Sequence, residues 1–338
     1  MKGVLLVNLG SPDSTSKSDV KRYLDEFLMD KRVIDSSYLI RAFVVKGIIL
    51  NTRPVKTAAA YKKIWWKEGS PLIEISRRFR EKVKDLVAIP VEMGMRYGNP
   101  SIKSSIQKLV DQGVTEIFMV PLYPQFAMAS TETVNVKAQD VIKKFFPEVK
   151  LTLVPAFYNR PDYIEVLSAN IKKQLDVAKP EMLLFSYHGI PERHVRRSDI
   201  TQSHCKIDGS CCQTPSPAHD FCYRHQCFET TRMVVEKLGL KDSEYMVSFQ
   251  SRLGKDPWLQ PFTDFVIDDF PKEGVKKLAV VTPAFVADCL ETLEEIGMEA
   301  KVSFLKHGGE EFASIECLNE DQDWIQVMAN WINDWEKK

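Results

Sequence analysis

The sequence predicts an α/β protein with two domains, each built on a parallel sheet flanked by helices, and a cleft between them. Short runs rich in Val, Ile and Leu recur along the chain, amphipathic stretches separate them, and 338 residues are more than one core usually serves. Strands that are buried on both faces and alternate with helices form parallel sheets with right-handed crossovers. Ligands of such sheets bind at the carboxyl ends of the strands, so two facing sheets suit a large, flat ligand.

The apolar runs predict seven strands, and the boundary between the two sheets lies near residues 151–155. The strands are 4–9, 91–95, 116–120, 151–154, 182–187, 246–249 and 278–282. The predicted helices are 18–29, 76–86, 102–112, 134–146, 163–176, 228–238, 289–296 and 324–335. We expect an N-terminal domain over 1–152, a C-terminal domain over 153–315, and a final helical segment, 316–338, that packs back across the first domain.

Composition and charge argue against several functions. Hydrophobic residues make up 44% of the chain and charged residues 27%, as in ordinary globular domains. Lys plus Arg and Asp plus Glu both number 46, so no overall field favours nucleic acid as a partner. Neither a glycine-rich dinucleotide motif nor a P-loop follows the first predicted strand, so nucleotide cofactors lose their usual support.

The apolar run at 4–9 is too short for a signal peptide and lacks a small-residue cleavage site. No stretch approaches the roughly 20 apolar residues of a transmembrane helix. We therefore expect a cytoplasmic protein. In that reducing compartment, clustered cysteines indicate a metal site rather than a set of disulfides.

His188 directly follows the predicted strand 182–187 and precedes Gly189 and Pro191. This position places it at the carboxyl edge of a sheet, where ligands bind. An imidazole titrates near neutrality, so it can accept a proton or bind a metal ion. Taken alone, a histidine in such a loop is more often an ordinary solvent-facing residue.

An acidic stretch follows the strand 278–282. Asp288, Glu291 and Glu295 are three and four residues apart, so they would share one face of an α-helix. Carboxylates this close repel one another unless they are protonated or hold a cation. The row could accept protons or guide a divalent metal ion, or it could simply complement the helix dipole.

The loop 249–261 leaves a predicted strand and is punctuated by glycine and proline. Its Trp258 could stack on a flat ligand, and Arg252 or Lys255 could pair with carboxylates. Most loops of this composition are simply packed against the protein and bind no ligand.

These segments together resemble the ferrochelatase family in order and spacing. They are Phe-Ser-Tyr-His-Gly-Ile-Pro at 185–191, Phe-Gln-Ser-Arg-Leu-Gly at 249–254, Pro-Trp-Leu at 257–259 and Glu-Thr-Leu at 291–293. Leu-Leu-Val-Asn-Leu-Gly-Ser-Pro at 5–12, Met-Arg-Tyr at 95–97 and Pro-Leu-Tyr-Pro-Gln at 121–125 fit the same pattern. The resemblance covers nearly the whole chain.

The resemblance implies two Rossmann-like domains of the chelatase type that hold a porphyrin. The implied activity is that of a lyase that inserts ferrous iron (Fe2+) into protoporphyrin IX or coproporphyrin III, a terminal step of heme biosynthesis. His188 matches the invariant histidine of the family, and Glu291 matches its acidic partner across the macrocycle. Asp288 and Glu295 match an acidic path for metal ions or protons. The positions that match the porphyrin lining are Leu9, Arg96, Tyr97, Tyr123 and Trp258.

Insertion of a metal ion must remove two pyrrole protons, and the resemblance implies that the enzyme bends the macrocycle to expose nitrogen lone pairs. We assign proton abstraction to His188, with or without direct contact to the metal. Glu291 is then the opposing proton acceptor or metal guide. Cys289 stands where many family members have a second histidine.

The segment 22–54 matches the active-site lip of the family. Its stretch 38–50 carries more apolar bulk than a solvated loop needs. One prediction is peripheral contact with the inner face of a membrane. The other is a buried helix that closes the cleft.

A cysteine-rich insertion, 200–227, has too few apolar residues for a core of its own. Its cysteines are Cys205, Cys211, Cys212, Cys222 and Cys227. A metal centre would supply the missing constraint, and four thiolates suit a 2Fe-2S cluster or zinc. The C-x-x-C pairs of zinc sites are absent, and the segment resembles an insertion that binds a 2Fe-2S cluster in some bacterial ferrochelatases. We expect that cluster on four of the five cysteines, with zinc as the alternative and free thiols third.

Two other functions stay open. A non-catalytic tetrapyrrole or metal-binding protein could use the same two-lobed architecture, although the combination of His188 with Glu291 favours an enzyme. A cobalt chelatase of the same fold is the second alternative, and the Gln-Ser-Arg and Pro-Trp-Leu segments favour the ferrochelatase branch over it.

Overall fold

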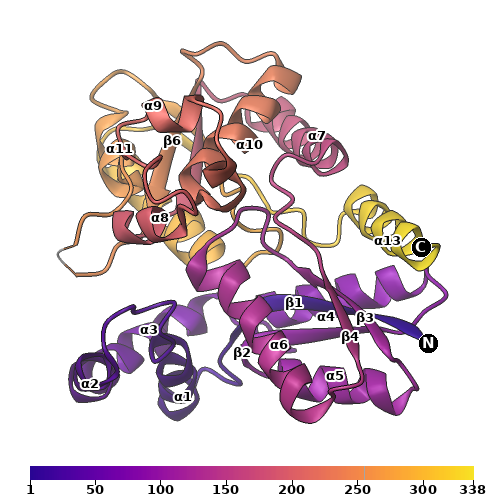
Figure 1. Ribbon diagram of the computed structural model, residues 1–338. Coiled ribbons are helices and arrows are strands. Elements are labelled where there is room, and N and C mark those ends of the chain that lie inside the picture. The colour runs from indigo at the N-terminus through magenta and orange to yellow at the C-terminus, as the bar shows by residue number, and fades with distance from the viewer. Residues whose placement is uncertain (255) are drawn as a thin grey trace. The chain divides into compact units, whose positions relative to one another are not determined.

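Two four-stranded parallel sheets organise the chain, one in each of two units (Figure 1). The computed structural model describes residues 1–254 and 256–338. The first unit comprises Met1–Tyr123, Met128–Pro155 and Asn319–Lys338, and the second comprises Pro124–Ala127 and Ala156–Leu318. The predicted α/β class with two parallel sheets is confirmed.

The sheet of the first unit has the strand order β2-β1-β3-β4. Its strands are β1 (Lys2–Ser11), β2 (Val91–Gly98), β3 (Glu116–Pro121) and β4 (Lys150–Leu153). Val4 of β1 pairs with Val91 on one side and Phe118 on the other, so β1 lies in the middle of the sheet. A central strand is covered on both faces, which explains why its sequence is an almost unbroken apolar run.

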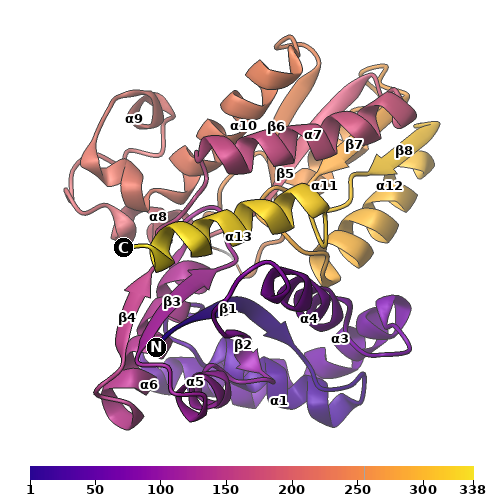
Figure 2. The ribbon, with the colours of Figure 1, turned by 90° about the vertical axis from the view of Figure 1, so that its right-hand side faces the viewer.

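Helices cover both faces of this sheet. They are α4 (Pro71–Lys84), α5 (Ile102–Asp111), α6 (Thr133–Phe145), preceded by the short π-helix η2 (Met128–Glu132), and α13 (Gln322–Glu336). On one face, Ile106 of α5 and Val134 of α6 join Leu5 and Val7 in a buried cluster. Figure 2 shows α4 and α13 on the opposite face, where Trp324 stacks on Phe79 with ring centroids 5.9 Å apart.

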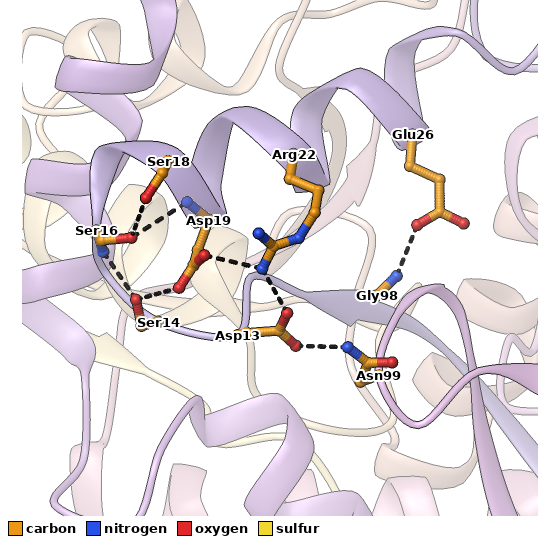
Figure 3. Close-up of polar contacts among 9 residues, drawn as sticks. All are labelled: Asp13, Ser14, Ser16, Ser18, Asp19, Arg22, Glu26, Gly98 and Asn99. Carbon is orange, nitrogen blue, oxygen red and sulfur yellow. Dashed lines mark hydrogen bonds and ion pairs between the residues drawn. The ribbon is translucent and has the colours of Figure 1, made fainter. Parts of the chain in front are cut away.

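Polar contacts tie helix α1 (Lys17–Leu28) to the loops that follow β1 and β2 (Figure 3). The hydroxyl of Ser16 accepts a hydrogen bond from the backbone N–H of Asp19 and caps the helix. Arg22 donates to Asp13 at 2.7 Å and to Asp19 at 2.8 Å, and Asn99 donates to Asp13 at 2.9 Å. The carboxyl ends of these two strands are therefore held together by side chains from both loops.

The lip segment forms α2 (Tyr38–Ala42), the π-helix η1 (Phe43–Ile49) and α3 (Leu50–Ile64). Val45 and Leu50 are buried, but Leu39 is 79% exposed and Phe43 is 70% exposed. The buried-helix prediction is therefore wrong for the outer face of this segment. No helix in the described ranges is long and apolar enough to span a membrane.

The sheet of the second unit has the order β6-β5-β7-β8. Its strands are β5 (Met182–His188), β6 (Tyr245–Gln250), β7 (Lys277–Val281) and β8 (Glu311–Ser314). Phe185 of β5 pairs with Val247 and Val281, so β5 is central. Strand β8 is missing from the sequence prediction, because a short, half-exposed edge strand carries no apolar run.

The helices of the second unit surround this sheet and carry the insertion. They are α7 (Pro161–Ala178), α8 (Glu192–Ser198), α9 (Ser210–Gln213), η3 (Pro217–Phe221), α10 (Tyr223–Leu238), α11 (Thr263–Asp269), η4 (Glu291–Ala300) and α12 (Lys301–Lys306). Helix α10 begins before residue 228 because the sulfur of Cys222 caps it, accepting from the N–H of His225. The predicted α-helix 289–296 is corrected to the π-helix η4, since spacings of three and four residues do not distinguish the two helix types.

Candidate active site

His188 is the last residue of β5, the strand that lies between β6 and β7 in the sheet of the second unit. Its ring nitrogen Nδ1 lies 2.7 Å from the carbonyl oxygen of Gly189. A carbonyl only accepts hydrogen bonds, so Nδ1 carries the proton in the neutral ring and Nε2 keeps its lone pair. The half-buried imidazole therefore has one basic nitrogen available for a proton or a metal ion.

The backbone around His188 is held on both sides. The hydroxyl of Tyr223 donates to the His188 carbonyl at 2.8 Å, and the Gly189 N–H donates to the Gln250 carbonyl at 2.6 Å. A Cβ on Gly189 would lie 2.8 Å from the Ser251 carbonyl oxygen and 2.9 Å from that of Gln250. Only glycine fits this close approach of the two strand ends.

The acidic row lies after β7 and reaches the end of β6. Glu291 opens η4 and Glu295 follows one turn later, and the hydroxyl of Ser251 donates to Glu295 at 2.8 Å. Burial, reinforced by the charge of Glu291, raises the pKa of Glu295 to about 7 despite that hydrogen bond. Glu295 can therefore gain or lose a proton near neutral pH.

Asp288 has a different place from the one that helical spacing predicts. It precedes the helical turns and is buried, and its carboxylate accepts a hydrogen bond from the Thr292 hydroxyl at 2.7 Å. The same hydroxyl accepts from the backbone N–H of Cys289 at 3.0 Å. Asp288 therefore stabilises the start of η4 and does not share one helical face with Glu291 and Glu295.

Aromatic rings flank the His188 segment. Phe285 lies edge-on to the imidazole with ring centroids 6.3 Å apart. Trp258 is partly exposed, and its backbone forms a bridge with Pro191. The indole N–H donates to the Leu253 carbonyl at 3.1 Å, which fixes the ring. The part of the loop at Trp258 thus lies along the residues that follow β5.

Of the two cations that the sequence analysis singled out in this loop, Arg252 is paired within the chain. Arg252 donates to Asp264 at 2.8 Å, and its guanidinium lies 4.5 Å from the ring centroid of Phe262. Its ionic partner is therefore a carboxylate of the chain itself. Lys255 lies outside the described residues.

The candidate porphyrin-lining residues of the first unit lie at the carboxyl edge of its own sheet. Leu9 is near the end of β1, Arg96 and Tyr97 are near the end of β2, and Tyr123 follows β3. Leu9 and Tyr123 are partly exposed, whereas Tyr97 is fully buried.

Arg96 and Tyr97 both bind Asp30, a residue that the sequence analysis did not single out. Arg96 forms an ion pair with Asp30, the Tyr97 hydroxyl donates to it at 3.0 Å, and Arg96 also donates to Thr133 at 2.7 Å. Burial opposes ionisation of Asp30, but hydrogen bonds from Thr133 and Arg32 and the charge of Arg96 lower its pKa. Burial raises the pKa of Tyr97, so this hydroxyl stays protonated and continues to donate.

Four of the five cysteines of the insertion lie close to one another, and the fifth lies apart from them. The thiol of Cys212 is hydrogen-bonded to those of Cys222 and Cys211, and the contact with Cys222 lowers the pKa of Cys212. Burial and the charge of Cys211 raise the pKa of the nearby Cys205 to about 11. Cys227 is instead fully buried in α10, where it contacts the Tyr223 hydroxyl. The four cysteines before α10 are thus neighbours, and the fifth belongs to the helix interior.

Three histidines surround the backbone of this cysteine group. His204 and His219 bond the Cys211 carbonyl at 2.7 and 2.9 Å, and His225 bonds the Cys212 carbonyl at 2.8 Å. The rings of His219 and His225 stack with centroids 3.6 Å apart. All three histidines lie within three residues of a cysteine in the sequence, which is a signal that could have identified them.

Asp199 anchors the first part of the insertion. Its buried carboxylate accepts from the backbone N–H groups of Thr201, His204 and Cys205, at 2.8 to 2.9 Å. Burial alone would raise the pKa of Asp199, but these bonds and the Thr201 hydroxyl lower it to about 2. Hydrogen bonds to the Asp199 carboxylate thus hold the backbone of residues 201–205 in place, in a segment that has too few apolar residues for a core of its own.

Comparisons with known proteins show matches over nearly the whole chain. The sequence profile of the family described as Ferrochelatase matches residues 1–335. The ferrochelatase of Opitutus terrae is 46% identical over 337 residues, 99% of this chain and 97% of the relative. That of Ectopseudomonas mendocina is 45% identical over 327 residues, 96% of this chain and 95% of the relative.

Among solved structures, SirB from Bacillus subtilis with Fe3+ is similar in fold, with a TM-score of 0.55 at 12% identity over 98% of this chain and 94% of that chain. The full-length matches are much closer in sequence, and they include the segments that carry His188 and Glu291. The chain therefore belongs to the ferrochelatase family.

Proposed function

We propose that this protein inserts ferrous iron into a porphyrin with release of two protons. The observation that carries the proposal is the family match over residues 1–335, which includes a histidine and a carboxylate row at the carboxyl edge of one sheet. The iron ion is a substrate of this reaction.

His188 accepts one pyrrole proton at Nε2. Its other nitrogen, Nδ1, keeps its hydrogen bond to the Gly189 carbonyl throughout, so the imidazolium is oriented and partly compensated as it forms. Glu291 stands at the start of η4 as the opposing acceptor or as a guide for the metal ion, and either role uses the same carboxylate oxygens.

Glu295 and Asp288 extend the carboxylate path. With a pKa of about 7, Glu295 can take a proton from Glu291 and pass it to solvent at neutral pH. Asp288 supports the path by holding Thr292 at the start of the helix.

Trp258, Leu9 and Tyr123 are the proposed porphyrin contacts, because each is partly exposed at the carboxyl edge of its sheet. Aromatic and aliphatic faces suit the flat macrocycle. Arg96 and Tyr97 act through the network around Asp30, which keeps the end of β2 rigid.

The test is an anaerobic assay of the purified chain with Fe2+ and, separately, protoporphyrin IX and coproporphyrin III. Formation of the iron porphyrin from one of the two porphyrins identifies that porphyrin as the substrate. If neither porphyrin is metallated, the proposal is overturned. A non-catalytic binder would bind porphyrin without metallating it, and a cobalt chelatase of this fold would instead insert cobalt into a sirohydrochlorin-type ring.

We further propose that Cys205, Cys211, Cys212 and Cys222 hold a 2Fe-2S cluster. Four neighbouring thiols are the donor set that such a cluster requires, and Cys212 lines a cavity of about 600 Å³ beside them. Among the described residues, no three His, Cys, Asp or Glu side chains are placed to hold one metal ion. This arrangement of the side chains favours neither the cluster nor the zinc alternative, and the proposal depends on the number and proximity of the thiols.

The visible spectrum of the anaerobically purified protein tests the cluster. We expect thiolate-to-iron absorption bands in the wild-type protein and in a Cys227→Ser variant, and their loss in Cys212→Ser. A colourless, iron-free wild-type protein, or loss of the bands in Cys227→Ser alone, would contradict the assignment.

The lip is a proposed peripheral contact with an anionic membrane surface. Leu39 and Phe43 are exposed, and Lys46, Arg53 and Lys56 are exposed close to them in the sequence. Apolar side chains beside cations bind the interface of anionic bilayers. The expected result is cosedimentation with anionic vesicles that a Leu39→Glu/Phe43→Glu variant loses; equal sedimentation of both proteins would refute the contact.

A further inference from the structure

Two thiols of the insertion are in direct contact although they belong to different helical segments. Cys212 lies in α9 and Cys222 caps α10, and their side chains are hydrogen-bonded to each other. A disulfide requires two sulfur atoms that can approach to bonding distance without movement of the backbone. Thiols that already touch meet this condition after a rotation of the side chains.

Cys211 also touches Cys212, but it is a poorer partner for a disulfide. The Cα atoms of consecutive residues are about 3.8 Å apart across a trans peptide. Cysteines that form a disulfide usually have Cα atoms about 4.4–6.8 Å apart, so a bond between neighbours distorts the chain. Cys222 is therefore the partner with which Cys212 can close a disulfide most easily.

The two thiols differ in their access to a reagent. Cys212 is half-buried and lines a cavity of about 600 Å³. Cys222 is buried, and its sulfur accepts a hydrogen bond from the backbone N–H of His225 at 3.5 Å. A small molecule that enters the cavity therefore meets Cys212 first.

The charges that line this cavity favour a reaction at Cys212 with an anionic molecule. The guanidinium of Arg224 donates to the sulfur of Cys212 at 3.2 Å and lies 4.8 Å from the ring centroid of Phe228. Glu229 and Arg232 also line the cavity, but they pair with each other at 2.7 Å. A cation beside a sulfur stabilises the thiolate, which is the nucleophilic form, and it also attracts carboxylates.

We propose that Cys212 and Cys222 form a reactive dithiol that reduces small disulfides bearing carboxylate groups. The Cys212 thiolate attacks one sulfur of the small disulfide, which forms a mixed disulfide and releases one thiolate. Cys222 then gives its proton to solvent and attacks the sulfur of Cys212, which releases the second thiolate. The chain loses two electrons and gains an internal disulfide, and the small disulfide becomes two thiols.

The inference does not rest on the proposed iron insertion. It also does not require the proposed cluster, because a cluster would occupy the same thiols. A single chain can therefore hold either the cluster or the reactive pair.

The test follows the reaction of the full-length protein, purified without air, with two chromogenic disulfides. One is dithiobis(nitrobenzoate), which carries carboxylates, and the other is the neutral dithiodipyridine. The measured quantities are the rate of thiolate release, the number of thiolates released per chain, and the masses of the cysteine-containing peptides. We expect a fast phase that releases two thiolates and leaves a disulfide between Cys212 and Cys222.

Variants separate the roles of the two cysteines. Cys212→Ser should lose the fast phase, whereas Cys222→Ser should stop after one thiolate and keep a mixed disulfide on Cys212. Serine is itself a good N-cap, so α10 should still form in Cys222→Ser. Cys227→Ser is the matched control and should react like the wild type, since Cys227 is fully buried in α10.

The role of Arg224 is tested by Arg224→Gln. This variant should react about tenfold more slowly with the carboxylate-bearing disulfide and be slowed less with the neutral one. Equal slowing with both reagents would overturn the preference for carboxylates.

The dithiol itself is overturned if the fast phase persists in Cys212→Ser, or if Cys222→Ser still releases two thiolates in that phase. A wild-type protein that shows the thiolate-to-iron bands and does not react also overturns it, while the cluster proposal stands. A colourless protein that forms no disulfide between Cys212 and Cys222 overturns both.

Discussion

The two sheets end in chemically different ways. In the first unit, the polar groups near the end of β2 are satisfied by one another: Arg96, Tyr97 and Thr133 all bind the carboxylate of Asp30. In the second unit, His188 keeps a basic nitrogen and Glu295 has a pKa raised to about 7. A closed network gives rigidity, whereas incompletely neutralised groups give reactivity. The carboxyl edge of the first sheet is thus held by a closed polar network, whereas the carboxyl edge of the second carries the groups to which we assign proton transfer.

The largest expected effect is the loss of iron-insertion activity when His188, at the carboxyl edge of the second sheet, is replaced. His188→Ala should lower kcat by about 10²- to 10⁴-fold, because it removes the proposed general base, and it should change the melting temperature little. The assay is anaerobic iron insertion together with thermal unfolding. His307→Ala is the control, since His307 lies on the surface of the same unit and bonds Ser303. Near-normal activity of His188→Ala would mean that the carboxyl edge of the second sheet does not supply the general base, and the proposed difference between the two sheets would be wrong.

The opposite response is expected at the closed network. The Asp30 and Arg96 side chains are 5% and 12% exposed, and loss of one partner from a buried ion pair costs roughly 3–5 kcal/mol. Asp30→Ala should therefore lower the free energy of unfolding of the first unit by that amount, measured in urea. Arg22→Ala, in the exposed pair with Asp13, should cost no more than about 1 kcal/mol. Equal effects of the two substitutions would mean that the network is not structural.

A smaller effect is expected at Asp199, which organises the insertion. Asp199→Asn weakens charge-assisted hydrogen bonds to three backbone N–H groups, so these amides should exchange roughly ten- to a hundredfold faster, corresponding to about 1–3 kcal/mol. Because the folded pKa of about 2 lies below the ordinary 3.8, the wild-type contribution is complete above pH 3.8 and is lost as the pH falls toward 2. Hydrogen exchange across residues 199–212 measures both effects, and unchanged protection in the variant would contradict this role.

The smallest and most specific effect is on the pH dependence. Ionised Glu295 is the form that accepts a proton, so kcat should rise with pH through an inflection near 7. Ser251→Ala removes a hydrogen bond that lowers this pKa, and the inflection should move upward; Glu295→Gln should abolish it. An inflection that is the same in all three proteins would exclude Glu295 as its origin.

Glu295 also affects stability with a definite sign. Its folded pKa of about 7 is above the ordinary value of 4.5, so the folded state favours the protonated carboxyl. This favourable contribution is complete below pH 4.5 and is lost as the pH rises through 7. Glu295→Gln should therefore be more stable than the wild type at pH 8, with little difference at pH 4.

The sequence by itself was enough to predict the α/β class, seven of the strands, and the location of His188 at a strand end. These features depend on local hydrophobic periodicity, and periodicity is written directly in the order of residues. The acidic row after β7 was predictable for the same reason. Family resemblance, carried by the segments around His188 and Glu291, added the chemistry that an isolated histidine could not indicate.

The tertiary structure alone decided which distant groups meet. Asp30 lies 66 residues from Arg96, and Tyr223 lies 35 residues from His188. It also decided that Cys227 belongs to the helix interior, whereas Cys212 and Cys222 are neighbours. Such contacts depend on strand order, helix type and the direction of side chains, and none of these is determined by the local sequence around either partner.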